Sequence, residues 1–321
     1  MGRRASTDGP DGLVVVDKPA GWTSHDVVAK SRGLLGTRKV GHAGTLDPDA
    51  TGVLLLGVGR ATKLLRFLSP LGKTYVGEVQ LGVETHTLDS SGAVTAVHDM
   101  AAVTLEDAAR AARSFQGEIQ QIPPMVSSVK VDGRRLHELA RKGEVVEREP
   151  RPVTIHELTV GSVPDPPGLR IGGRPDPAWQ EAAAGGSGPA FAIEVRCSSG
   201  TYVRTLAADL GAALGGGAHL RSLRRTAVGP FTLDDAVPLE RVSPEAVLPM
   251  VEVVRHLRRI EADDDVVAAV AVGKVLERSD LGVEADDQGP WALVAASSGE
   301  LLAVYEPFRG TTAKPAVVVA R

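Results

Sequence analysis

The sequence predicts an α+β protein with a mixed or antiparallel sheet, followed by a small domain rich in β-strands. Strand and helix patterns are interleaved over residues 12–248, but the strands outnumber the helices that could join them as βαβ units. After residue 250 the chain turns acidic, and residues 291–305 carry a hairpin pattern with a turn at 297–299. A length of 321 residues is enough for two domains, each with its own core.

The first part of the chain alternates short strands with short helices. Apolar or alternating runs predict strands at residues 13–16, 53–56 and 73–81. Cap and stop residues predict helices over residues 24–35, 61–68 and 105–116. Thr23 or Ser24 can cap the first of these helices, and Gly36 ends it. Thr104 and Asp107 resemble a capping box before the third.

The rest of the chain adds strands, one further helix start and two segments of unusual composition. Further strands are predicted at residues 153–160, 191–197, 218–228 and 315–320. A short helix over 135–142 is predicted inside the charge-dense segment 130–151, and residues 200–211 lead from a strand into a helix. Residues 164–190 are rich in Pro, Gly and Ala and predict a flexible insertion, while residues 1–11 predict a disordered tail. The predicted domains are therefore 12–248 and 250–321.

Composition excludes several classes of protein. Cys197 is the single cysteine, so no intrachain disulfide can form and a reducing, cytoplasmic location is expected. The polar N-terminus is not a secretory signal, and no apolar run is long enough to cross a membrane. The eight histidines are scattered without metal-ligand spacing, and no glycine pattern matches a nucleotide-binding loop. We therefore expect no metal and no cofactor, and a monomer is the default expectation.

Charge is segregated along the chain although the net charge is only −4. Residues 30–73 carry eight Lys and Arg against two Asp, and residues 196–225 carry five Arg against one Asp. Residues 261–300 carry ten acidic side chains against two basic ones. Most charge runs are simply solvated surface, but this segregation also allows a basic, RNA-binding face on an acidic protein.

A glycine-bounded loop within residues 39–63 presents Asp47 just before a buried strand. An aspartate before a proline is most often only a turn former, and a tyrosine on an alternating strand, such as Tyr75, most often packs in a core. Arg204 begins an otherwise apolar helix and needs an anionic partner if it points inward. If Arg204 meets Asp47, the carboxylate is held ionised and suits a nucleophile.

Six stretches in order resemble the TruB-type tRNA pseudouridine synthases over residues 12–240. They read VDKPAGWTSHD, GHAGTLDPDATGVLLLGVGRATK, KTYVGEVQLG, QIPPMVSSVKVDGRRLHELARKG, CSSGTYVRTLAADLG and AHLRSLRRTAVG. The resemblance implies a mixed sheet around an RNA-binding cleft. It also implies isomerisation of uridine 55 in the T-loop of tRNA to pseudouridine, without metal or cofactor, after the base is flipped out of its stack. The partner would be tRNA, bound through its T-arm.

The resemblance also implies residue roles. Asp47 would be the nucleophile, at either the base or the sugar, Tyr75 would stack on the target base and move a proton, and Arg204 would pair with the aspartate. The residues implied in substrate binding are His42, Lys18, Pro19, Tyr202, Leu223 and Asp89. The residues expected on the RNA backbone are Lys39, Lys63, Lys130, Arg134, Arg135, Arg141 and Lys142, of which the last five lie in the segment 130–151 that resembles an RNA-clamping insertion.

The sequence departs from the family pattern at two positions near the site. His86 stands where the family usually has an aspartate, and Asp49 stands where a leucine is common. The tail after residue 250 resembles a PUA-like β domain. Two alternatives stay open from the residues alone, namely a non-catalytic tRNA-binding or tRNA-folding protein and a synthase that acts on another RNA.

Overall fold

The protein is described from a computed structural model. The described residues are 9–127, 130–131, 133–135, 144, 146–162, 185–284 and 286–320. Arg141, Lys142 and most of the predicted tail and of the predicted insertion lie outside them, as do the side chains of Lys130 and Arg135. The predicted helix 135–142 also lies outside them except for Arg135, which the structure places in a strand.

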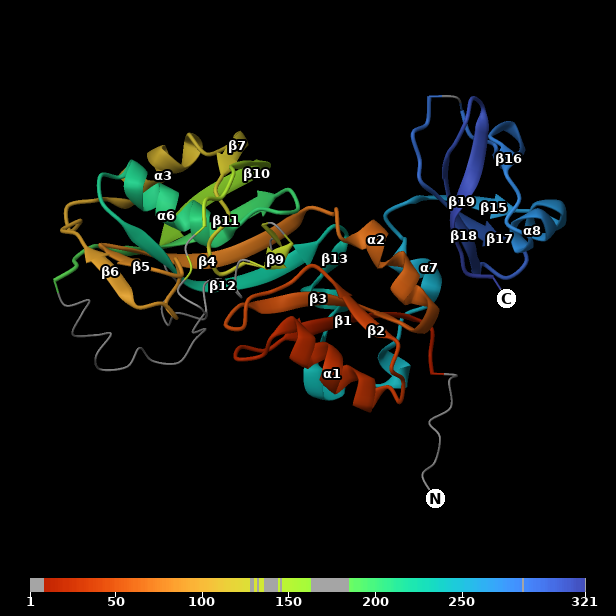
Figure 1. Ribbon diagram of the computed structural model, residues 1–321, viewed down its shortest axis with the longest axis horizontal. Coiled ribbons are helices and arrows are strands. Elements are labelled where there is room, and N and C mark those ends of the chain that lie inside the picture. The colour runs from red at the N-terminus through yellow and green to blue at the C-terminus, as the bar shows by residue number, and fades with distance from the viewer. Residues whose placement is uncertain are drawn as a thin grey trace, which may run out of the picture.

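A large mixed sheet forms the centre of the described part of the chain (Figure 1). Its main path runs β14-β1-β3-β12-β4-β11-β10-β7, with β2 paired to β3 and β13 paired to β12. The bounds are β1 (Gly12–Lys18), β2 (Val40–Ala43), β3 (Thr51–Val58), β4 (Lys73–Leu81), β7 (Gly117–Gln121), β10 (Arg151–Ser162), β11 (Ala190–Cys197), β12 (Ala218–Val228), β13 (Phe231–Thr232) and β14 (Val237–Pro238). The β1–β14 and β3–β12 pairs are parallel and the other pairs are antiparallel, so the predicted mixed α+β class is confirmed.

Helices pack on both faces of this sheet, whereas α8 (Asp264–Ala271) packs on the C-terminal strands. The helices are α1 (Ser24–Leu34), α2 (Leu65–Leu68), α3 (Leu105–Arg113), α6 (Val203–Ala213), α7 (Met250–Val253) and α8 (Asp264–Ala271). The 3₁₀ helices are η1 (Gly59–Leu64), η2 (Leu233–Asp235), η3 (Leu239–Arg241), η4 (Pro244–Ala246) and η5 (Ser279–Leu281). Thr23 with Asp26 and Thr104 with Asp107 form complete capping boxes at α1 and α3, so both predicted helix starts are confirmed.

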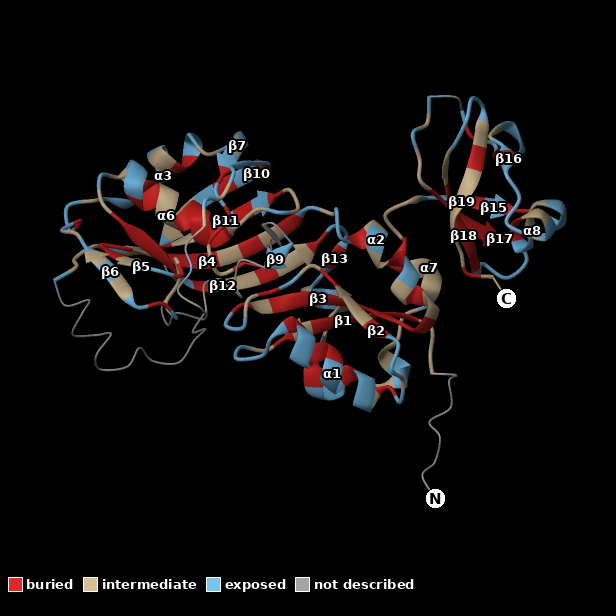
Figure 2. Cartoon of the chain, in the orientation of Figure 1, coloured by how far each residue is buried: buried red, intermediate tan, exposed pale blue. Residues whose placement is uncertain are grey.

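The apolar run at residues 53–56 lies in strand β3, which is buried on both faces of the sheet. Leu54 and Leu56 pack on the α1 side of the sheet, whereas Val53 and Leu55 pack on the opposite side with η1 and α2. A strand buried on both faces reads as a continuous apolar run rather than as an alternation. Figure 2 shows β1 and β3 buried along nearly their whole length. The loop that precedes β3 is therefore anchored to a strand that is buried on both faces.

A second sheet of five described strands, in the order β15-β17-β18-β19-β16, lies toward the C-terminus. Its strands are β15 (Arg258–Ala262), β16 (Leu276–Glu277), β17 (Trp291–Ala295), β18 (Leu301–Pro307) and β19 (Thr312–Val318), and the β17–β18 pair confirms the predicted hairpin. Leu301 and Val304 pack in one core with Leu64 and Leu68 of the first domain. The two sheets are thus joined by buried apolar contacts.

Two short hairpins complete the described structure. They are β5 (Val83–Thr85) with β6 (Val94–Val97), and β8 (Lys130–Val131) with β9 (Arg134–Arg135). The last residues of the predicted insertion 164–190 are ordered, since the backbone of Ser187 bonds to His98 and Met100. No helix in the described ranges is long and apolar enough to cross a membrane.

Candidate active site

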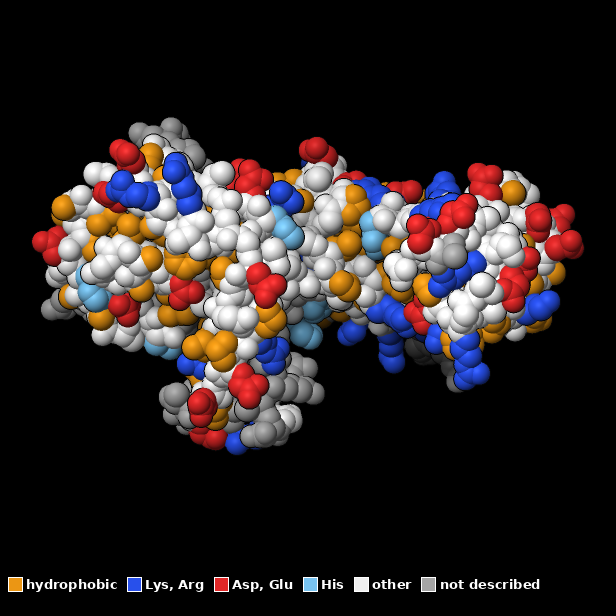
Figure 3. All heavy atoms as spheres, turned by 90° about the horizontal axis from the view of Figure 1, so that it is seen from above, with side chains coloured by type: hydrophobic (Ala, Val, Ile, Leu, Met, Phe, Trp, Pro, Cys, Tyr) orange, Lys and Arg blue, Asp and Glu red, His pale blue; other side chains and the backbone are white. Residues whose placement is uncertain are grey.

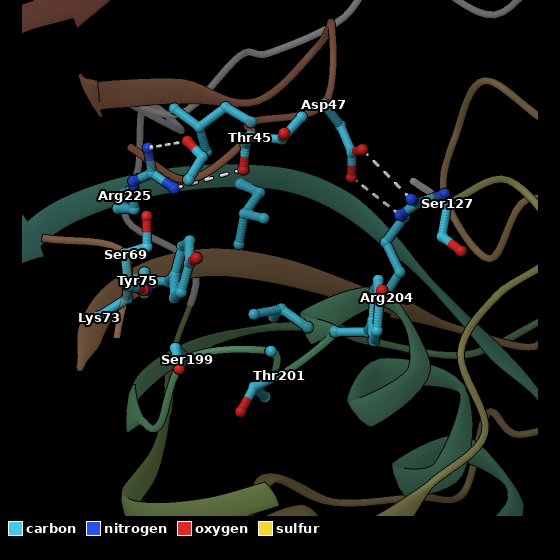
Figure 4. A pocket seen from close by; sticks show the side chains of 16 residues that line it. Thr45, Asp47, Ser69, Lys73, Tyr75, Ser127, Ser199, Thr201, Arg204 and Arg225 are labelled. Atoms are coloured by element: carbon cyan, nitrogen blue, oxygen red, sulfur yellow. Dashed lines mark hydrogen bonds and ion pairs between the residues drawn. The ribbon is translucent and has the colours of Figure 1, made fainter. Parts of the chain in front are cut away.

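Five of the predicted site residues line one cavity of about 250 Å³. These residues are Asp47, Tyr75, Tyr202, Arg204 and Leu223. They come from the loop between β2 and β3, from β4, from the start of α6 and from β12, which are far apart in the sequence but adjacent in the sheet. Figure 4 shows Asp47 and Arg204 pointing toward each other on one side of the cavity, with Tyr75 on the other side. The sequence prediction that these side chains gather at one site agrees with this geometry.

Hydrogen bonds from α1 and β12 hold the loop that carries Asp47. Ser24 Oγ accepts a bond from the backbone N of Leu46 at 2.9 Å and donates to its carbonyl at 3.2 Å. Arg225 Nη2 and Nη1 donate to the carbonyls of Gly44 and Thr45 at 3.2 and 3.4 Å. Gly44 has φ of 83°, a left-handed conformation that a side chain would strain. The loop is therefore fixed on the N-terminal side of Asp47 by buried polar contacts.

Lys18 holds the same loop from the other side. Its side chain is fully buried, and Nζ donates to the carbonyls of Pro19, Trp22 and Pro48 at 2.9, 2.6 and 2.8 Å. All three N–H donors of the ammonium are thus used by the backbone. The structure places Lys18 beneath the loop rather than in the wall of the cavity. Its contribution is to position the segment that follows Asp47.

Asp47 and Arg204 form a two-pronged ion pair across the cavity wall. Arg204 Nε lies 3.0 Å from Asp47 Oδ2, and Nη2 donates to Oδ1 at 3.2 Å. Arg204 also donates to the carbonyls of Thr87 and Val126 at 2.9 Å each, and Asp89 Oδ2 lies 3.3 Å from its Nη1. The Arg204 side chain is 6% exposed, whereas the Asp47 side chain is 43% exposed. The guanidinium is therefore locked in place while the carboxylate remains open to the cavity.

Burial raises the pKa of the Asp47 carboxyl above its usual range, and the negative charges of Asp89 and Asp49 act in the same direction. The Arg204 guanidinium and the Lys18 ammonium oppose this shift because they stabilise the carboxylate. The sequence led us to expect that Arg204, if it met Asp47, would hold the carboxylate ionised. The Arg204 charge does favour the carboxylate, but burial acts against it, and the pKa of Asp47 is raised.

The raised pKa predicts a shifted acid limb in the pH dependence of the chemical step. If Asp47 must be ionised to react, the single-turnover rate should fall as the pH drops through the raised pKa, which lies above the 3.8 of an ordinary Asp. Quench-flow rates with saturating protein between pH 4 and pH 8 check this. A rate that stays constant down to pH 4 would contradict the assigned role.

Two tyrosines and a leucine shape the remaining walls. Tyr75 is 8% exposed, and burial raises the pKa of its hydroxyl, so the phenol is protonated at neutral pH. Tyr202 is the N-cap residue of α6. Its backbone N donates to Gln121 Oε1 at 2.9 Å, and Gln121 Nε2 donates to its carbonyl at 3.3 Å. Leu223 sits opposite Gly77 on the neighbouring strand. A flat ring and an apolar side chain beside a carboxylate suit a planar pyrimidine.

The other predicted binding residues lie around the cavity rather than in its wall. The His42 ring packs edge-on against His25 with 5.3 Å between centroids, and burial lowers its pKa to about 4, so it is neutral at physiological pH. Asp89 accepts bonds from Thr87 and Ser91 and reaches Arg204, so it braces the arginine. Pro19 is half-buried beside Lys18.

Three of the seven predicted backbone-binding cations have side chains that the structure describes. Lys39 and Lys63 are exposed, and Arg134 is exposed but forms an ion pair with Glu144 at 3.0 Å. Figure 3 shows Lys and Arg side chains along the lower edge of the view, between the large sheet and the C-terminal sheet. This basic edge gives the acidic protein a local surface that suits an RNA backbone.

The structure also explains the departure at His86. Its Nδ1 accepts a hydrogen bond from the backbone N of Ala93 at 2.9 Å. A carboxylate oxygen could accept the same bond, so His86 can replace an aspartate in closing the loop between β5 and β6. That loop carries Thr87 and Asp89, which hold Arg204. The change therefore preserves the loop while removing one negative charge from it.

Sequence reasoning missed three residues of the site. Gln121 positions Tyr202, while Lys73 and Arg225 line the cavity beside Tyr75. One signal was available, because Lys73 lies two residues before Tyr75 on the same strand and therefore on the same face. Arg225 could not be found this way, because its pairing opposite Tyr75 depends on the register between β4 and β12.

Comparison with known proteins decides the family. Residues 32–203 match the N-terminal domain of the TruB family of pseudouridylate synthases, and residues 204–260 match a tRNA pseudouridylate synthase B C-terminal domain. The chain belongs to the TruB family. It is 46% identical over 314 residues to the tRNA pseudouridine synthase B of Arthrobacter sp. (strain FB24), covering 96% of both chains. It is 45% identical over 316 residues to that of Thermobifida fusca (strain YX), covering 97% of this chain and 99% of the other.

Solved structures agree with the TruB family assignment. A chain of a Cbf5-Nop10-Gar1 complex superposes with a TM-score of 0.67 at 26% identity, covering 99% of this chain and 91% of that one. A chain of the archaeal box H/ACA Nop10-Cbf5 complex gives 0.64 at 26% identity, covering 97% and 86%. The likeness extends over both sheets, so the predicted resemblance and the fold class are both confirmed.

Proposed function

We propose that this protein isomerises uridine 55 in the T-loop of tRNA to pseudouridine, with Asp47 as the nucleophile. The observation that carries the proposal is the cavity in which an open carboxylate, a locked arginine and a buried tyrosine meet. TruB family membership supports the reaction type, and relatives named tRNA pseudouridine synthase B support tRNA as the substrate. We further propose that the protein acts as a monomer in the cytoplasm and holds tRNA by its T-arm.

The geometry suggests how the reaction proceeds. The target base has to leave its stack because the cavity encloses only about one nucleoside. Tyr75 and Leu223 would then hold the flipped ring within reach of Asp47. Whether the carboxylate adds to the base or to the sugar, the bond between C1′ and N1 breaks, the ring turns, and C1′ bonds to C5. Arg204 keeps the carboxylate aimed at the cavity throughout.

The basic segments would hold the rest of the T-arm. Lys39 and Lys63 are exposed and would contact the RNA backbone. The segment 130–151, with Lys130, Arg134, Arg135, Arg141 and Lys142, would clamp the RNA. Phosphate contacts release counterions, so tRNA affinity should fall as salt rises. His42 and Pro19 would contact the loop from which the base has flipped.

Release of tritium from tRNA labelled at uracil C5 tests the function, because C5 loses its proton only when it bonds to the sugar. We expect near-stoichiometric release with wild-type protein, and a single modified position when the tRNA is mapped. A protein that binds tRNA but releases no tritium would instead be a binding or folding factor. Modification of a different RNA in a total RNA pool would replace the proposed substrate.

A further inference from the structure

We propose that Lys73 and Arg225 form an anion-stabilising end of the cavity, where they stabilise the negative charge that develops on the uracil ring. The inference rests on the proposed function, because only a reaction at the base places charge there. Both side chains line the cavity beside Tyr75. Figure 4 shows them on the side of the cavity opposite Asp47 and Arg204.

Both cations are buried without a compensating anion. Lys73 is 7% exposed and Arg225 is 1% exposed. Within the described residues, neither has a carboxylate oxygen within the 4.0 Å of an ion pair. A buried charge is strongly unfavourable unless hydrogen bonds or an opposite charge compensate it. Two such charges at one end of one cavity indicate an anionic group in the bound state.

Backbone carbonyls accept most of the hydrogen bonds of both cations, and the Tyr75 hydroxyl is a further side-chain partner of Arg225. Lys73 Nζ donates to Ser69 O and Leu71 O at 2.9 and 2.7 Å. Arg225 Nε donates to Val53 O at 2.7 Å, besides its two bonds to the active-site loop. These acceptors orient the side chains but leave their charges unneutralised. An ammonium has three donors, and within the described ranges two donors of Lys73 have hydrogen-bond acceptors, so the third can serve a ligand.

Lys18 is a buried lysine of the same protein with a structural role, and it serves as a comparison for Lys73. All three of its donors are used by carbonyls, and it lies outside the cavity wall. Lys73 differs in both respects. Burial and the neighbouring Arg225 lower the pKa of Lys73 to about 8, so its ammonium is still protonated at neutral pH.

Electron counting shows why the uracil becomes negative by either route. If the bond between C1′ and N1 breaks first, its electron pair leaves with the ring, which becomes a monoanion shared among N1, O2 and O4. If Asp47 first adds to C6, the electron pair of the C5–C6 double bond moves through C4 to O4. In both cases that pair later forms the bond from C5 to C1′, the Asp47 carboxylate is restored, the C5 proton is lost, and N1 gains a proton.

Fixed positive groups facing the developing charge accelerate such a step. Removal of one preorganised donor of this kind typically lowers a rate by roughly 10²-fold to 10³-fold. The charge is absent in the bound but unreacted uridine, so binding of tRNA should change little. This difference between rate and affinity separates charge stabilisation from simple support of the fold.

The test compares Lys73→Gln with wild type on tRNA that carries either uridine or 5-fluorouridine at the target position. Gln keeps two N–H donors for the two carbonyls and removes the charge and the third donor, which are the two features assigned to the bound anion. Fluorine withdraws electrons and stabilises the ring anion by itself. We expect loss of the uridine C1′–N1 bond under single turnover to slow by about 10²-fold, as followed by chromatographic separation of the nucleosides from digested tRNA. With 5-fluorouridine the loss should be about 10-fold or less, and tRNA Kd should stay within about threefold of wild type.

Lys73→Arg restores the charge and should recover most of the uridine rate. Lys73→Met provides a second neutral variant if Lys73→Gln does not fold, as judged by circular dichroism. An unchanged rate, an equal loss with both substrates, or a loss confined to Kd would overturn the inference. Wild-type protein that leaves uridine intact would instead refute the proposed function, and this inference with it.

Discussion

Asp47→Asn should abolish isomerisation while leaving the fold and tRNA binding intact. The amide has nearly the shape of the carboxylate but is not a nucleophile, so we expect a loss of about 10⁴-fold or more in the single-turnover rate. Arg204 still donates to the Thr87 and Val126 carbonyls and still lies beside Asp89. The arginine should therefore stay in place in the variant. Tritium release, thermal unfolding and tRNA Kd measured on the same preparation check the three parts of this expectation.

Asp49→Asn is the matched control for this substitution. Asp49 is exposed on the same loop, two residues away, and unlike Asp47 it does not line the cavity. Its charge raises the pKa of Asp47, so its removal should leave activity at neutral pH and shift the acid limb slightly to lower pH. Equal losses of isomerisation rate in the two variants would mean that the reaction depends on the loop as a whole and not on the Asp47 carboxylate.

Arg204→Met should lower the isomerisation rate by the second largest factor. The pH dependence of its rate shows whether the arginine lowers the pKa of Asp47. Without the guanidinium, the pKa of Asp47 should rise further because its main stabilising charge is gone. We expect the rate at pH 7 to fall by roughly 10²-fold to 10³-fold, with part of it recovered as the pH rises. Because solvent screens the half-exposed Asp47 carboxylate, the loss of stability on urea unfolding should stay below the cost of about 3–5 kcal/mol for breaking a fully buried pair.

Arg196→Met provides the contrast for that measurement. Arg196 pairs with Glu157 at 3.6 Å on the surface, where both side chains are more than half exposed. Exposed pairs of this kind contribute about 0–1 kcal/mol, so stability and activity should stay close to wild type. An Arg204→Met acid limb that coincides with the wild-type limb would show that the arginine does not tune Asp47.

The elements that the sequence predicted well are those with local signals. Both capping boxes, the alternating strand β4 and the β17–β18 hairpin lie where cap residues, period-two patterns and turn residues placed them. The meeting of Asp47, Tyr75 and Arg204 came from the residues only as a conditional statement. The family resemblance supplied the pairing that the ion pair now displays.

Features set by tertiary contacts were beyond the sequence. Strand β2 was expected to be loop because its four residues, which include Gly41 and His42, show no clear hydrophobic period. Helix α8 was missed inside a domain expected to be mainly β. The pKa of Asp47 depends on how much solvent the surrounding side chains exclude, and no motif encodes that quantity. Lys73 and Arg225 can be recognised as neighbours only when the register between β4 and β12 is known.

Mapping of pseudouridine at tRNA position 55 in cells tests the central claim most directly. A strain that lacks the gene for this protein should carry unmodified uridine 55. Wild-type protein supplied from a plasmid should restore pseudouridine, and Asp47→Asn produced at the same level should not. Full modification with Asp47→Asn, or an unchanged position 55 in the strain that lacks the protein, would contradict the account.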